Sequence, residues 1–166
     1  MFKHLMLSLA LLLLPLTPVL AEEANEISWD DLMPEGWIPL MPQQDAEFFA
    51  SHEESVAPIL PEPQALPPTV PELNGKQVKI PGYILPIKYD TTSVSEFLLV
   101  PFVGACIHVP PPPENQMIYI KLAKPYVSEG LWAPVWVSGT LEVKQADTQY
   151  ATALYQMNDG IAQIYE

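Results

Sequence analysis

The chain has 166 residues, enough for one domain with a modest core, and its single cysteine excludes an internal disulfide. It carries 20 acidic residues against 7 basic ones, all of them lysines, for a net charge of −13. Nucleic acid and anionic lipid are therefore poor partners, because both are bound by clustered cations.

The first 21 residues are typical of a cleaved secretory signal peptide. Lys3 supplies the positive start, residues 5–14 form the apolar run, and Val19 and Ala21 are small residues at positions that suit a signal peptidase. The run is shorter than the roughly 20 apolar residues that a membrane-spanning helix needs. We therefore expect a periplasmic mature protein with no membrane span.

Residues 22–73 form an acidic, proline-rich arm with 12 acidic residues and no lysine. We expect a short helical turn near Trp29 to Met33, docked on the core through its apolar side chains. A second short helix is expected within 43–55 from the spacing of its aromatic residues. The prolines of 57–73 predict an extended, semi-rigid connector to the following domain.

Residues 74–166 are predicted to form the folded domain. Five short strands follow one another with no convincing helix between most of them, which predicts a mainly β fold, a small antiparallel OB-like barrel that is partly open. The expected strands lie within 74–87, 97–103, 117–123, 135–143 and 151–166. Segment 97–103 is apolar at every position, so both faces of that strand should be buried. Trp136 should face outward and be covered by the arm.

Cys106 and His108 are the candidate metal ligands. Positions i and i+2 of a strand lie on one face, about 6.6 Å apart, so a thiolate and an imidazole there could both reach one zinc ion. Copper(I) also favours this pair, and Glu114 is a weaker candidate for a further ligand. Two alternatives stay open. Cys106 could be a buried small hydrophobic residue, or a nucleophile with His108 as its base, which the lack of an oxyanion-hole motif or an orienting acid disfavours.

A proline run follows the pair directly. Pro110, Pro111, Pro112 and Pro113 should form a stiff extended strut, which would fix where Glu114, Asn115 and Gln116 stand. A rigid exposed loop of this kind loses little entropy when it binds a partner. The prolines together with Asn115 and Gln116 are therefore a candidate binding loop.

Four blocks of sequence resemble the bacterial domain-of-unknown-function family 3299. They are ISWDDLMP (27–34), NGKQVKIPGYILPI (74–87), FLLVPFVGACIHVPPPPENQ (97–116) and VWVSGTLEV (135–143). The resemblance implies a small exported protein with an OB-like barrel and no established catalysis, encoded beside metal-responsive transporter genes, zinc in particular. We therefore expect a soluble periplasmic accessory or binding protein in zinc homeostasis or transport, whose partner is a metal-transport component. The alternative is a non-metal interaction module that docks on another envelope protein through its proline-braced loop.

Overall fold

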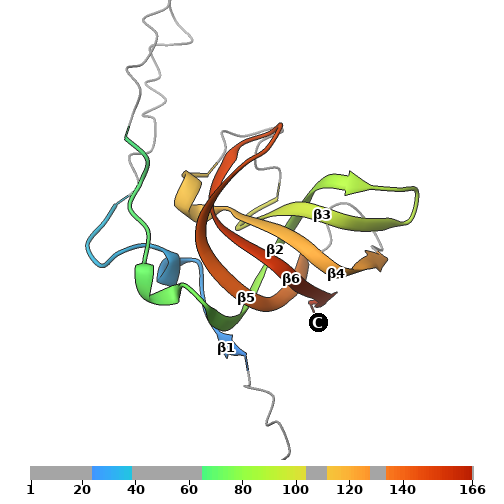
Figure 1. The fold of residues 1–166 in the computed structure, drawn as a ribbon, viewed down its shortest axis with the longest axis horizontal. Helices are drawn as coiled ribbons and strands as arrows, with labels where there is room; N and C mark the ends of the chain where they lie inside the picture. Colours follow the sequence, from blue (N-terminus) through green and yellow to red (C-terminus); the bar gives the residue numbers. More distant parts are fainter. Residues whose placement is uncertain (1–23, 39–64, 104–111, 128–133, 166) are drawn as a thin grey trace, which may run out of the picture.

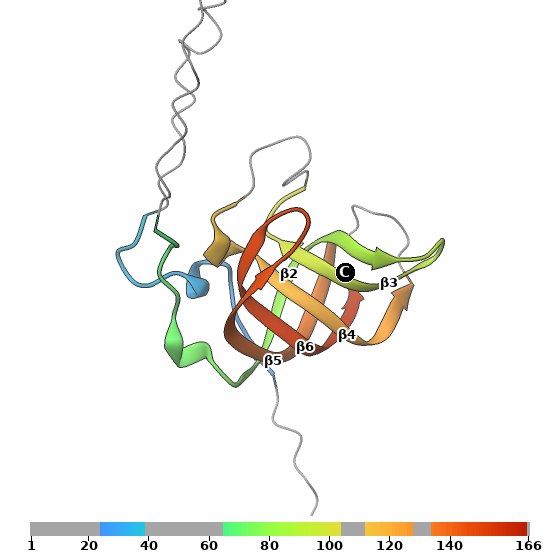
Figure 2. The ribbon, with the colours of Figure 1, turned by 45° about the horizontal axis from the view of Figure 1, so that its top comes forward.

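The computed structural model describes residues 24–38, 65–103, 112–127 and 134–165 (Figures 1 and 2). In chain order its elements, with η for a single turn of 3-10 helix, are β1 (Asn25–Glu26), η1 (Asp30–Leu32), η3 (Pro71–Leu73), β2 (Lys76–Tyr89), β3 (Ser93–Val100), η4 (Glu114–Gln116), β4 (Ile118–Val127), β5 (Pro134–Asp147) and β6 (Thr152–Ile164). The signal peptide and the helix expected within 43–55 lie outside the described residues. Within the described ranges, no helix has the length and apolar character needed to cross a membrane.

Five strands close into a barrel, which confirms the predicted mainly β fold, although the ring is closed by strand pairing where a partly open barrel was expected. The hydrogen-bonded order is β2-β3-β4-β6-β5, and a further pairing of β2 with β5 closes the ring. Every contact in the ring is antiparallel except the one between β4 and β6, which is parallel. The prediction of a purely antiparallel barrel is corrected in this detail, because a closed ring with an odd number of strands cannot alternate direction at every contact.

Strand β2 is shared between two neighbours. It pairs with β5 from Lys76 to Tyr83 and with β3 from Tyr83 to Tyr89. Gly82 lies where β2 passes from one partner to the other. A Cβ atom there would stand 2.8 Å from the Leu99 side chain and 2.9 Å from the Val100 carbonyl oxygen. The close approach of two strands therefore requires a glycine at this bend.

Strand β3 is buried on both faces from Phe97 to Val100, as its apolar sequence predicts. The expectation of burial over the whole of 97–103 is wrong at its end, because β3 stops at Val100 and the side chains of Phe102 and Val103 are 40% and 50% exposed. Phe97 and Leu99 point into the barrel core, whereas Leu98 and Val100 belong to a second apolar cluster on the other face of the sheet. The buried members of this second cluster are Leu85, Leu98, Val100, Met117 and Ala153. Both faces of β3 thus contribute to hydrophobic stabilisation.

The arm contributes to the barrel core rather than lying on it loosely. Ile27 and Leu32 belong to the core cluster, and Leu32 is fully buried. The expected helical turn is η1, whose last residue is Leu32. β1 pairs in parallel with β2, and the Ile27 N–H continues this pairing by donating to the Lys79 carbonyl at 2.9 Å. Arm and barrel therefore share one hydrophobic core.

Candidate functional site

The candidate metal ligands Cys106 and His108 lie outside the described residues, together with Pro110 and Pro111. Their placement on a common face therefore stays a prediction. Glu114 is described and is the first residue of η4, where it is partly exposed. Within the described ranges, no group of three or more histidine, cysteine or carboxylate side chains is placed to hold a metal ion.

Asn115 and Gln116, predicted to stand on an exposed binding loop, are buried. Asn115 is fully buried and Gln116 is 8% exposed, so the expectation of exposed side chains is wrong for these two residues. The Asn115 side-chain amide donates to the Pro68 carbonyl at 2.8 Å, and that of Gln116 donates to the Trp29 carbonyl at 2.9 Å. Their burial is possible because each side-chain amide donates a hydrogen bond to a backbone carbonyl of the arm, 47 and 87 residues earlier in the chain.

Their neighbours Pro112 and Pro113 lead directly into η4. Pro112 is buried and Pro113 is partly buried. The Pro113 carbonyl accepts a hydrogen bond of 2.8 Å from the Gln116 N–H, which closes the single turn of η4. The end of the proline run therefore orients the two amide side chains toward the arm, and whether the loop also binds a partner stays a prediction.

Tyr155 joins the arm to the barrel at two places. Its side chain is fully buried in the core. Its hydroxyl donates to the Leu32 carbonyl at 2.8 Å and accepts a hydrogen bond of 2.8 Å from the Val70 N–H. Burial raises the pKa of Tyr155, so the hydroxyl keeps its proton and can do both at once. Sequence reasoning assigned no role to this residue, although a buried tyrosine hydroxyl ordinarily needs a partner.

Trp29 and Trp136 have different roles. The Trp29 indole N–H donates to the Pro81 carbonyl at 2.8 Å, a further contact between arm and barrel. Trp136 faces outward, as predicted. Among the described residues, its ring contacts come from Lys79 and Tyr165 of the barrel domain rather than from the arm, which was expected to cover it. Lys79 Nζ lies 4.2 Å from the ring centroid, and the Tyr165 ring stacks on it at 5.1 Å.

A groove of about 740 Å³ lies between the two arm segments, 30–35 and 69–72. Figure 1 shows these segments side by side at one end of the molecule, the first coloured blue and the second green. The carboxylates of Asp30, Asp31 and Glu35 line it from the first segment, and that of Glu72 from the second. No lysine lines this groove, which we call the arm groove.

The four carboxylates of the arm groove are not equivalent. Asp31 Oδ2 accepts hydrogen bonds from the Ser28 N–H at 2.7 Å and the Ser28 hydroxyl at 2.8 Å, which hold the pKa of Asp31 below its usual value. For Asp30, Glu35 and Glu72 the described part of the chain supplies no ion pair and no side-chain hydrogen bond. These three carboxylates are exposed and available to a positively charged ligand.

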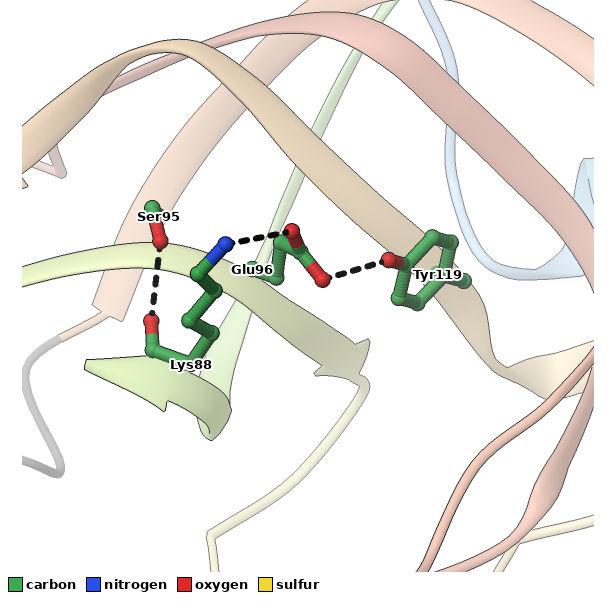
Figure 3. A network of polar contacts seen from close by, with 4 residues as sticks. All are labelled: Lys88, Ser95, Glu96 and Tyr119. Carbon is green, nitrogen blue, oxygen red and sulfur yellow. Dashed lines mark hydrogen bonds and ion pairs between the residues drawn. The ribbon is translucent and has the colours of Figure 1, made fainter.

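A polar network on β2, β3 and β4 joins the charged side chains of Lys88 and Glu96 to Tyr119 (Figure 3). The Tyr119 hydroxyl donates to Glu96 Oε2 at 2.8 Å, and Lys88 Nζ lies 3.6 Å from Glu96 Oε1. Burial is the main reason that the pKa of Tyr119 is raised to about 12, and the hydrogen bond to Glu96 and the negative charge of Glu96 add to the shift. Because the phenol keeps its proton at neutral pH, the network is suited to joining strands rather than to acid–base chemistry.

These features define a small β-barrel protein whose N-terminal arm is built into the core. The family model described as "Protein of unknown function (DUF3299)" matches residues 29–163, and the chain belongs to this family. The resemblance seen in the four sequence blocks is thereby confirmed.

A solved structure shows the same fold. It is the crystal structure of a DUF3299 family protein from Pseudomonas aeruginosa PAO1, which is 40% identical to this chain and superposes with a TM-score of 0.69. The match covers 87% of this chain and 97% of that one. No curated protein matches the chain.

Proposed function

We propose that this chain is an exported accessory protein that binds a partner in the periplasm, and that it acts through the face where the arm meets the barrel. The observation that carries the proposal is the Tyr155 hydroxyl, which bridges Leu32 at the end of η1 and Val70 just before η3, and so fixes two segments of the arm. A surface fixed before binding loses less conformational entropy on association.

Three further hydrogen bonds support a preformed surface. Trp29, Asn115 and Gln116 each donate a side-chain N–H to a backbone carbonyl across the junction of arm and barrel. Two of them come from η4, directly after the proline run. Inside the barrel, large side chains such as Phe97 and Met157 are fully buried, as expected for a small barrel filled by its own residues. Binding at an outer face is therefore favoured over binding in a lumen.

The periplasmic location rests on the first 21 residues, whose charge, apolar run and small residues fit a secretory signal. The lone cysteine is consistent with a chain that depends on packing rather than on disulfides for stability. Fractionation of cells expressing the untagged full chain tests the location. Mature protein that begins near Glu22 and is released with the periplasmic fraction supports it, whereas an uncleaved chain in the cytoplasm contradicts it.

The binding role is tested by site-specific photo-crosslinking in the living cell. A photoreactive amino acid at Ile38, which is 80% exposed and follows the groove residue Glu35 by three positions in the chain, should form an adduct with a defined envelope protein. The same amino acid at Lys144, exposed on β5, is the control. The Tyr155→Phe variant should lower the yield at Ile38. Equal adducts at both positions, or none at Ile38, would contradict the proposal.

Divalent-metal homeostasis, with zinc as the first metal, is the second candidate function. It is favoured by the spacing of Cys106 and His108, with Glu114 following on η4. Zinc titration of the reduced mature chain should show at least micromolar affinity that is lost in Cys106→Ala and in His108→Ala. Unchanged affinity in both variants would assign any zinc binding to the acidic arm instead.

A further inference from the structure

We infer that the arm groove receives an extended, positively charged segment of the partner protein, with lysine or arginine side chains directed at Asp30, Glu35 and Glu72. This inference rests on the proposed binding role and adds the chemistry of the partner. It is carried by the groove between the two arm segments, by the apolar part of its lining, which fits long aliphatic stems, and by charges that the described part of the chain does not neutralise.

The charge of the groove is uncompensated within the described part of the chain. The two ion pairs found there join Lys79 to Glu26 and Lys88 to Glu96, and neither involves a groove carboxylate. Lysine is also absent from residues 22–73, the whole of the arm. A cationic partner is therefore complementary to this surface, whereas an acidic one is repelled.

The remaining lining of the groove is largely apolar. Met33 and Pro34 contribute from the first segment, and Val70 and Pro71 from the second. Lysine and arginine bury their aliphatic stems against apolar surface while the charged head stays at a polar rim. A lining that combines carboxylates with apolar side chains therefore fits lysine and arginine better than it fits a bare metal ion, which would gain nothing from the apolar part.

The dimensions favour a chain segment over a folded surface. The groove volume of about 740 Å³ is that of a pocket for a small ligand, so it admits a few side chains and not a second domain. The walls are two stretches of arm held at a fixed separation by the Tyr155 hydroxyl, which bonds to one residue of each. An extended segment lying between them can present charged side chains to both walls.

Fluorescence anisotropy tests this with a labelled decapeptide that alternates lysine and alanine, added to the mature chain at low salt. The groove variant Asp30→Asn/Glu35→Gln/Glu72→Gln should weaken binding by at least about tenfold. The control variant Glu47→Gln/Glu53→Gln/Glu54→Gln removes the same charge from the same arm and should weaken binding by less than about threefold. Melting temperatures should stay unchanged in the groove variant, because its three carboxylates have no partner in the described structure.

Three results would overturn the inference. The first is absence of binding by the unmodified mature chain, and the second is equal weakening in the two triple variants, which would indicate general attraction to an acidic arm. The third is zinc alone binding at micromolar concentration and losing that affinity in the groove variant, which would make the groove a cation site. An adduct that still forms at Ile38 in any of these cases would leave the proposed binding role intact.

Discussion

Replacing Tyr155 with phenylalanine should uncouple the arm from the barrel at a cost that can be worked out from the structure. The change removes one oxygen atom from a fully buried side chain. It leaves the Leu32 carbonyl and the Val70 N–H without the partner that each has at 2.8 Å. An unsatisfied buried backbone group costs about 1–3 kcal/mol, which applies to the Leu32 carbonyl, whereas the hydrogen bond of the Val70 N–H is only partly buried and its loss costs less. With some local relaxation, we expect the free energy of unfolding to fall by about 2–4 kcal/mol.

Urea denaturation followed by tryptophan fluorescence and far-ultraviolet circular dichroism measures this loss. Fluorescence includes Trp29, which lies on the arm and bonds to barrel residues through both its indole and its carbonyl. Tyr150→Phe is the matched control, because Tyr150 is 42% exposed and its change should cost less than about 0.5 kcal/mol. A Tyr155→Phe protein as stable as this control would refute the assigned role of the hydroxyl.

Three more changes test the packing and the electrostatics. Leu32→Ala should lower the free energy of unfolding by about 2–5 kcal/mol, since this arm residue is fully buried in the core; a loss below 1 kcal/mol in urea would contradict a shared core. Gly82→Ala should cost about 1–3 kcal/mol in the same assay, because the added Cβ meets Leu99 and a backbone oxygen, and unchanged stability would show that β2 and β3 can separate there. Tyr119 has a pKa of about 12 when folded against 10.0 ordinarily, so the unfolded chain releases this proton first and stability should fall as the pH rises above 10 toward 12. Glu96→Gln should bring the tyrosinate absorbance titration of Tyr119 closer to 10, and an unmoved titration would exclude the carboxylate as a cause.

The strands could be predicted from the sequence because the polarity of each strand residue follows the face, buried or exposed, on which its side chain lies. The unbroken apolar stretch of β3 predicts burial on both faces, and the structure divides it between two clusters. The parallel contact between β4 and β6 could not be read in this way. It arises from the closure of the ring, which depends on the number of strands and not on any local pattern.

The junction of arm and barrel was harder to predict for a physical reason. Asn115 and Gln116 follow a proline run, and polar residues after prolines ordinarily lie in exposed loops. Their partners are backbone carbonyls of Pro68 and Trp29. Because every residue has a backbone carbonyl, the sequence does not indicate which one accepts a hydrogen bond. Tyr155 was missed for the same reason, since its two partners are also backbone groups. A hydrogen bond between a polar side chain and a distant backbone group therefore cannot be predicted before the fold is known.

Native-state hydrogen exchange at the Val70 amide tests most directly whether arm and barrel form one binding unit. This N–H donates to the Tyr155 hydroxyl and belongs to the arm, whereas the amide of Ile120 belongs to the core strand β4. If the two parts unfold together, the opening free energies of the two amides should agree within about 1 kcal/mol. A Val70 amide that exchanges several kcal/mol more easily while Ile120 stays protected would show that the arm detaches by itself, and the preformed surface would then not exist.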